Sequence, residues 1–271
     1  MATRFDTWES YFYPPPDDGT LRNLFDERDP LVLSRLEYVE TALRQRQLNA
    51  DPSLVAHTFD ASHVRAIHWH LFQDVYEWAG QYRTVNMAKG VGRGFGDVKT
   101  GEVDRYLADV QRLVLGTEWG RLDREEFGAK AAEVFAYLNQ AHPFREGNGR
   151  TSKVFMEHVA ERSRFTLDYS RVTPLEWNNA SMLSAPDLGT YAPVPASLVP
   201  VFRAIAVDRT STSTPGADPA SRHRSPLSAS YPKPASEATR GGAEQSGVAP
   251  RRGGPYLPGR GYGGGGRGEG R

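Results

Sequence analysis

The chain has 271 residues, of which 38% are hydrophobic and 24% are charged, so it can form one large soluble domain or two small ones. It contains no cysteine, which excludes disulfide bonds and thiol catalysis and fits a cytoplasmic location. No apolar run reaches the roughly eighteen residues that a membrane span needs. Acidic and aromatic residues near the N-terminus stand where a signal peptide would need an apolar stretch, so we expect no membrane association.

The formal net charge of zero hides two regions of opposite charge. Residues 209–271 carry ten Lys or Arg against four Asp or Glu, and they hold 14 of the 27 glycines and 8 of the 19 prolines. Such a segment cannot bury enough apolar surface to offset its ordering entropy. We therefore predict one folded domain over 1–208 and a disordered basic tail over 209–271. We interpret this tail as a solvated extension rather than a nucleic-acid-binding arm.

Apolar residues recur at helical spacing through most of 1–208, and acidic residues mark several helix starts. Asp29 followed by Pro30 predicts a helix that passes through Leu36, Val39 and Leu43. Asp60 predicts the start of a second helix that ends at Gly80, and Asp123 predicts the start of another that passes through Leu138 and ends at or near His142. Further helices are expected over 103–114, from about 149 to 159, around 173–183 and around 195–207. The fold class is therefore all-α, a helical bundle.

Residues 84–96 interrupt the helical pattern. Thr84 and Val85 are followed by four glycines within eleven residues. Extended residues followed by glycines indicate a β-hairpin or an extended flap. We expect one small β-hairpin flap on an otherwise helical domain.

The stretch NQAHPFREGNGRTSKVF, residues 139–155, interrupts one apolar helical pattern and starts another. Pro143 ends the first helix at or near His142. Gly147 and Gly149 allow a tight turn and a close approach of the backbone to a ligand. The amides of residues 147–151 then lie at a helix N-terminus, where unpaired N–H groups and the helix dipole attract an anion. The loop is predicted to bind phosphate.

The side chains of this loop suit a polyphosphate and its metal. Glu146 is a hard oxygen donor for Mg²⁺, and Arg150 can neutralise charge on a leaving phosphate. Asn148 can donate a neutral hydrogen bond to a phosphate oxygen. His142 has a pKa range suited to removing a proton from an attacking hydroxyl, and Phe144 is expected to anchor the loop in the core. The loop is not a Walker loop, because no G-x-x-x-x-G-K-[ST] occurs.

With these residues the chain resembles the Fic family, whose pattern is H-P-F-x-[D/E]-G-N-G-R-x-x-R. Residues 142–153 read HPFREGNGRTSK, so only the last position differs, with Lys153 where the family has Arg. The segments 11–23, 64–80 and 83–90 are similar to compact bacterial Fic toxins. The resemblance covers most of 1–208 and none of the tail.

The resemblance implies a helical core that uses ATP with Mg²⁺ and transfers AMP to a Ser, Thr or Tyr hydroxyl of a target protein. It also implies the toxin of a toxin–antitoxin pair, with a small antitoxin supplying an inhibitory glutamate. His142 would be the general base and Glu146 the metal ligand. The flap over 84–96 would align the target chain by strand addition. The phosphate-binding residues would be Gly147, Asn148, Gly149, Arg150, Lys153 and Lys89, the last near the flap tip.

Two other functions remain open at this stage. One is phosphotransfer, as in the related Doc toxins, against which the intact Gly-Asn-Gly argues. The other is a nucleotide-binding regulator whose turnover is disabled by Lys153. His63, His68 and His70 could suggest a metal site, but we interpret them as structural, because no cysteine or carboxylate completes a ligand set.

Overall fold

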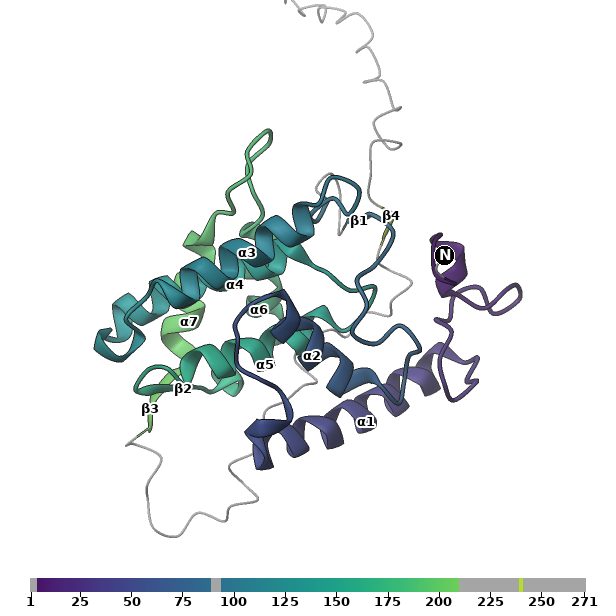
Figure 1. Cartoon of the computed structure of the whole chain (residues 1–271), viewed down its shortest axis with the longest axis horizontal. Helices are drawn as coiled ribbons and strands as arrows, with labels where there is room; N and C mark the ends of the chain where they lie inside the picture. Colours follow the sequence, from purple (N-terminus) through teal and green to yellow (C-terminus); the bar gives the residue numbers. More distant parts are fainter. Residues whose placement is uncertain (1–3, 89–93, 210–238, 241–271) are drawn as a thin grey trace, which may run out of the picture.

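The computed structural model describes residues 4–88, 94–209 and 239–240 (Figure 1). The α-helices in these residues are α1 (Pro30–Ala50), α2 (Ala61–Phe72), α3 (Glu102–Leu115), α4 (Arg124–Ala141), α5 (Asn148–Ala160), α6 (Pro174–Leu183) and α7 (Val199–Ile205). The strands are β1 (Met87–Ala88), β2 (Phe165–Leu167), β3 (Ala206–Asp208) and β4 (Thr239–Arg240). Short 3₁₀ helices span Glu9–Tyr11, Pro52–Leu54, Trp119–Arg121, Tyr169–Arg171 and Pro195–Ser197.

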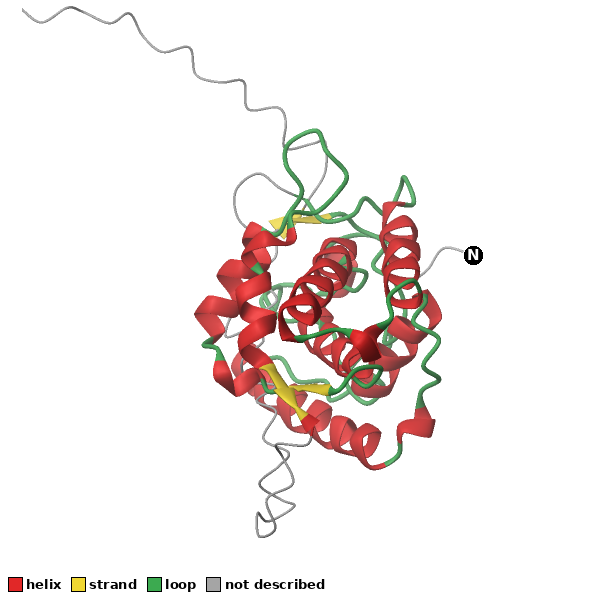
Figure 2. Ribbon diagram, turned by 90° about the vertical axis from the view of Figure 1, so that its left-hand side faces the viewer, coloured by secondary structure: helices red, strands yellow, loops and turns green. Residues whose placement is uncertain are grey.

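Helix α4 lies at the centre of the helical body and packs against α3, α5 and α7. Helix α2 packs between α5 and α1, so Figure 1 shows a succession from α3 and α4 through α5 and α2 to α1. Figure 2 shows the two strand pairs at separate edges of this body. Strands β2 and β3 pair antiparallel with Phe165 opposite Asp208, and β1 and β4 pair antiparallel with Met87 opposite Arg240. The expected mainly helical fold with a small β element is confirmed.

The predicted helix starts are confirmed by their capping hydrogen bonds. The Asp29 carboxylate accepts the amides of Leu31 at 2.7 Å and Val32 at 3.2 Å. The Asp60 carboxylate accepts the amide of His63 at 2.9 Å, and Asp123 begins α4 with a reciprocal capping box. Capping depends on residues two to three positions apart, which is why sequence alone located these starts.

Helix α2 is shorter than predicted. It ends at Phe72, and residues 73–80 form turns instead of continuing to Gly80. Tyr76 and Trp78 are both only 2% exposed, and their rings stack at 4.2 Å. Residues two apart on a helix point in different directions, so the helix has to stop for both rings to enter the core.

Helix α1 buries a polar face. Leu36, Val39 and Leu43 are 37%, 52% and 46% exposed, whereas Glu37 and Thr41 are buried. The apolar spacing correctly indicated a helix, but the side that faces the protein is the one that carries the glutamate. Glu37 is thereby directed from α1 toward the rest of the domain.

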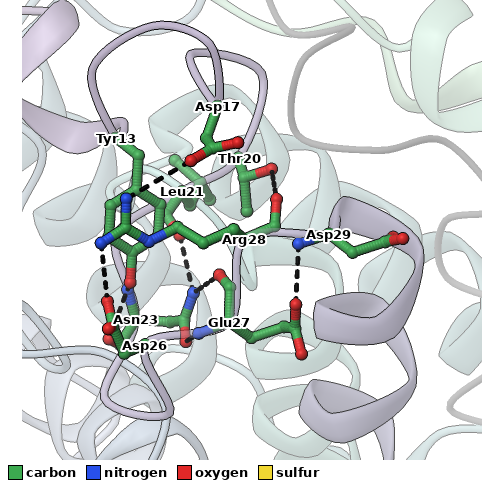
Figure 3. A network of polar contacts seen from close by, with 9 residues as sticks. All are labelled: Tyr13, Asp17, Thr20, Leu21, Asn23, Asp26, Glu27, Arg28 and Asp29. Atoms are coloured by element: carbon green, nitrogen blue, oxygen red, sulfur yellow. Dashed lines mark hydrogen bonds and ion pairs between the residues drawn. The ribbon is translucent and has the colours of Figure 1, made fainter.

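The segment before α1 is fixed by its own polar network (Figure 3). The Asn23 side chain donates to the carbonyls of Leu21 at 3.0 Å and Glu27 at 2.8 Å. The Glu27 carboxylate accepts the amide of Asp29 at 2.7 Å, and Asp29 caps α1. This chain of contacts sets where α1 begins, and with it the position of Glu37.

The flap and the tail are only partly described. Ala88 forms an antiparallel bridge to Gly94, as in a hairpin, while the predicted phosphate ligand Lys89 lies outside the described residues. Arg209, the first residue of the predicted tail, donates its amide to the Arg164 carbonyl at 2.9 Å. The rest of that tail, apart from β4, also lies outside the described residues. Among the described helices, none combines the length and hydropathy of a membrane span.

Candidate active site

The loop between α4 and α5 reverses the chain through two residues in the left-handed conformation. His142 caps the C-terminus of α4 with φ of 40°, and Gly147 precedes α5 with φ of 82°. A Cβ at Gly147 would lie 2.3 Å from the ring of Phe72, so only glycine fits there. The reversal brings His142 to the same end of the bundle as the N-terminus of α5.

The Asn148 side chain closes this loop. Its Oδ1 accepts the amide of Phe144 at 2.9 Å, and its Nδ2 donates to the carbonyl of Phe144 at 2.7 Å. The predicted core anchor Phe144 is fully buried. Gly149 and Arg150 follow in the first turn of α5, where amides have no acceptor within the helix. The loop therefore presents a helix N-terminus suited to an anion.

Arg83 joins the loop to the flap, and the sequence analysis did not single it out. Its buried guanidinium donates to the carbonyls of His142 at 2.8 Å, Val85 at 2.8 Å and Gly96 at 2.5 Å. Burial lowers the pKa of Arg83 to about 10, so the group remains charged at neutral pH. Both ends of the flap are thus fixed relative to His142.

The flap also contacts the candidate base directly. The ring of Phe95 stacks on the ring of His142 with centroids 3.6 Å apart and planes 6° apart. The amide of Phe95 donates to the carbonyl of Met87 at 3.0 Å, which ties this ring to β1. Strand β1 is therefore connected to His142 through Phe95, and a strand that pairs with β1 would lie near His142.

A cavity of about 480 Å³ adjoins the flap and shares Phe95 with the candidate base. Within it the rings of Tyr106 and Tyr191 stack at 4.4 Å, and the Arg105 guanidinium lies 4.5 Å from the ring of Tyr191. Its volume lies in the range of small-molecule sites. The lining residues are Gly94, Phe95, Glu102, Arg105, Tyr106, Gln140, Pro186, Asp187, Leu188, Gly189, Thr190 and Tyr191.

Arg150 points toward α1 and is held by an ion pair with Glu37. It also donates to Thr41 Oγ1 at 3.3 Å and lies 3.7 Å from the Glu146 carboxylate. The Tyr76 hydroxyl donates to the second oxygen of Glu37. Burial raises the pKa of Glu37 against the opposing effect of Arg150. No sequence pattern indicated this contact, because Glu37 and Arg150 lie on different helices and are 113 residues apart.

The two remaining described site residues differ in their surroundings. The Glu146 side chain is 21% exposed, and its Oε1 accepts the amide of Gly147 at 3.0 Å. Lys153 is 3% exposed, with Nζ 4.8 Å from the ring of Tyr169 and 5.2 Å from that of Trp177. Burial lowers the pKa of Lys153 to about 8. Arg150 and Lys153 thus start from one helix but contact different neighbours.

A second group of histidines lies away from the loop. Ring nitrogens of His57, His63 and His158 lie within 4.8 Å of one another, a spacing that could suggest a metal. His63 Nδ1 accepts the amide of Phe59 at 3.1 Å, so in the neutral ring the proton is on Nε2, 2.9 Å from His158 Nδ1. That proton occupies the position that a metal would need. Burial lowers the pKa values of His63 to about 4 and His158 to about 3, which fits a neutral structural pair.

Comparisons with known proteins agree with this geometry. The sequence pattern of the Fic/DOC family matches residues 58–160. The chain is 34% identical over 173 residues to the protein adenylyltransferase VbhT of Bartonella schoenbuchensis, covering 64% of this chain and 35% of VbhT. It is 35% identical over 185 residues to the probable protein adenylyltransferase y4lH of Sinorhizobium fredii, covering 68% of this chain and 91% of y4lH. The chain thus spans about a third of the first relative and most of the second.

Solved structures show the same fold. The BepC protein of Bartonella tribocorum with bound AMPPNP superposes with a TM-score of 0.65 at 25% identity, covering 74% of this chain and 98% of BepC. The N-terminal Fic domain of a Bartonella quintana effector with bound ADP gives 0.63 at 30% identity, covering 74% and 96%. Both contain adenine nucleotides.

The Glu37–Arg150 pair yields a stability prediction. Arg150→Gln should lower the free energy of unfolding by about 3 kcal/mol, because it leaves the Glu37 carboxylate buried without its cation. The double variant Glu37→Gln/Arg150→Gln should recover part of this loss. Urea unfolding of the wild type, the single variants Glu37→Gln and Arg150→Gln, and the double variant measures the coupling. Arg112→Gln, which breaks an exposed pair with Asp109, serves as a control and should leave the free energy of unfolding nearly unchanged. Additive losses in the double variant would contradict the coupling.

Proposed function

Because the chain belongs to the Fic/DOC family, we propose that it is a protein adenylyltransferase that transfers AMP from ATP to a Ser, Thr or Tyr hydroxyl of a target protein. The observation that carries this proposal is the loop of residues 142–150, in which His142 shares one end of the bundle with the N-terminus of α5. The names of the two relatives and the nucleotides in the two solved structures support it.

In this mechanism the residues of the loop act on the attacking hydroxyl and on the phosphates. His142 takes the proton of the target hydroxyl, whose oxygen attacks the α-phosphorus, and pyrophosphate leaves. The amides of Gly147, Gly149 and Arg150 hold phosphate oxygens at the start of α5. Stacking on Phe95 and the Arg83 contact to its carbonyl fix His142 for this proton transfer.

The donor set of the loop fits Mg²⁺. Glu146 offers a hard, partly exposed carboxylate beside the amides that would hold the phosphates. Mg²⁺ often takes one or two carboxylates together with substrate phosphates and water, so one protein ligand is sufficient. The ion would neutralise phosphate charge, and Glu146 would hold it.

The flap is proposed to align the target chain by strand addition along β1. One edge of β1 already bonds to Gly94 and Phe95, and β4 of the same chain pairs antiparallel at Ala88 and Met87. The edge of β1 that pairs with β4 is the edge on which a target strand would pair in place of β4. A target residue on that strand would lie close to Phe95 and His142.

The principal test follows AMP transfer by mass spectrometry. A target lysate incubated with ATP should gain the mass of AMP on hydroxyl residues, and His142→Ala should slow this by at least about a hundredfold. Calorimetry should show nearly unchanged ATP affinity for the variant, because a general base contributes little to ground-state binding. A gain of phosphate would instead support Doc-like transfer, and no gain would support a nucleotide-binding regulator. Full transfer by His142→Ala would remove that residue from the mechanism.

Lys153 is proposed to serve the polyphosphate less well than an arginine would. Lysine offers a mobile point charge, whereas arginine can bind two oxygens through a planar fork. A charge-assisted hydrogen bond contributes about 1.5–3 kcal/mol, so Lys153→Arg should tighten ATP binding or speed transfer by about tenfold. Lys153→Met, similar in length but uncharged, should weaken both. Equal kinetics for the three proteins would assign Lys153 to the core contacts with Tyr169 and Trp177 alone.

We also propose that the chain is a toxin whose inhibitory glutamate comes from a separate small antitoxin. The resemblance to Fic proteins implies inhibition by a glutamate in a motif of the form [S/T]-x-x-x-E-[G/N], which lies in the same chain or in a partner protein. Here only Glu146 and Glu269 precede Gly or Asn, and His142 and Gly265 stand four residues before them. Purification from the native host should therefore yield a small partner protein that slows AMP transfer. A lone chain that a point substitution activates strongly would contradict this.

A further inference from the structure

His68 lies in the middle of α2 and uses both ring nitrogens. It is fully buried, and its Nδ1 accepts the amide of Gly80 at 2.8 Å. Its Nε2 lies 3.0 Å from the carbonyl oxygen of Glu146 in the catalytic loop. An amide can only donate, so Nδ1 must be the unprotonated nitrogen. The proton of the neutral ring is therefore on Nε2 and is donated to Glu146.

Packing fixes the orientation of this ring. It stacks on Phe144 with centroids 3.8 Å apart and on Phe72 with centroids 4.6 Å apart. The Gly80 amide is held in place by a turn with φ of 72°, where a Cβ would lie 2.8 Å from Trp69. Because the ring can neither rotate nor exchange its two partners, the Nε2 donor has one fixed direction.

The carbonyl that His68 binds belongs to the peptide between Glu146 and Gly147. In a trans peptide the C=O and the N–H point in opposite directions. A donor that holds the Glu146 oxygen on the α2 side therefore directs the Gly147 amide to the opposite side, where it meets the Glu146 carboxylate at 3.0 Å. Glycine at 147 has little intrinsic resistance to rotation of this peptide. The loop needs an external contact to keep it in one orientation.

We propose that His68 is a positioning residue that fixes the 146–147 peptide and so sets the direction of the Gly147 amide, which donates to the Glu146 carboxylate here and would donate to a phosphate of a bound nucleotide. This inference rests on the proposed function for its role in transfer. His68 does not touch the reacting atoms and moves no proton in the reaction. Its contribution is the orientation of one backbone donor.

Two substitutions distinguish the hydrogen bond made by Nε2 from the one made by Nδ1. The amide of Gln can place its nitrogen near the position of Nε2, so His68→Gln retains a donor for the Glu146 carbonyl. The side chain of Asn ends near Nδ1, so His68→Asn retains an acceptor for Gly80 but does not reach the loop. Both variants lose the same ring stacking and should show similar losses in thermal stability. They therefore control for each other.

We expect His68→Asn to lower AMP transfer by about tenfold to a hundredfold, mainly through kcat, while His68→Gln stays within a few-fold of the wild type. The amide resonance of Gly147 should shift on addition of ADP in the wild type and in His68→Gln but not in His68→Asn. Equal transfer and equal Gly147 shifts in the two variants would overturn the proposal. If the wild type binds ADP with the Gly147 shift but transfers no AMP, the proposed function fails while the positioning role is retained.

A further measurement uses only the wild-type protein, so its result does not depend on whether His68→Gln and His68→Asn fold. Nitrogen NMR of the histidine rings in the full chain should show His68 as the neutral tautomer with its proton on Nε2. That proton should exchange slowly, because it is buried and hydrogen-bonded to Glu146. Observation of the Nδ1 tautomer would exclude donation to the loop and overturn the proposal.

Discussion

The closure of the loop between α4 and α5 is the constraint on which the rest of the site depends. The Asn148 side chain bonds both backbone groups of Phe144, and this contact holds two consecutive helices in a sharp reversal. Because Asn148 closes the loop, the distance between His142 at its start and the first amides of α5 at its end is fixed. A looser connection would leave the proposed base His142 and the proposed anion site as two independent groups.

Buried polar side chains from other elements hold this closed loop from several directions. Arg83 bonds the His142 carbonyl, His68 the Glu146 carbonyl, and Glu37 the Arg150 guanidinium. Buried polar groups lower stability unless they are paired, so placing three of them around one loop is costly unless each is satisfied. All three find partners, and the loop gains a single conformation from them. The stability of the domain and the geometry of the site are thus coupled.

The flap, on which we propose that the target chain docks, is joined to this same framework. Arg83 bonds Val85 and Gly96 as well as His142, and Phe95 stacks on the imidazole. A chain added to β1 would therefore be positioned relative to His142, the proposed base, through the contacts of Arg83 and Phe95. The pairing of β4 with β1 is consistent with a flap backbone that accepts strands of varied sequence, because main-chain hydrogen bonds do not depend on side chains.

The sequence by itself determined the features that depend on near neighbours along the chain. The caps at Asp29, Asp60 and Asp123 and the helix break at Pro143 involve residues a few positions apart, and they could be read directly. The family resemblance added the fold and the expected roles of the loop residues. The sequence did not determine which side chains surround these loop residues. Lys153, for example, lies over the rings of Tyr169 and Trp177, which belong to later segments of the chain.

Only the tertiary structure decided which side of α1 faces the protein, where α2 ends and what supports the loop. Glu37 meets Arg150 across 113 residues, His68 meets Glu146 across 78, and Arg83 meets His142 across 59. Apolar periodicity indicated that α1 is a helix, but it cannot show that the buried face carries a glutamate whose cation lies on another helix. Such contacts depend on how the helices pack against one another, and no local pattern in the chain encodes that packing.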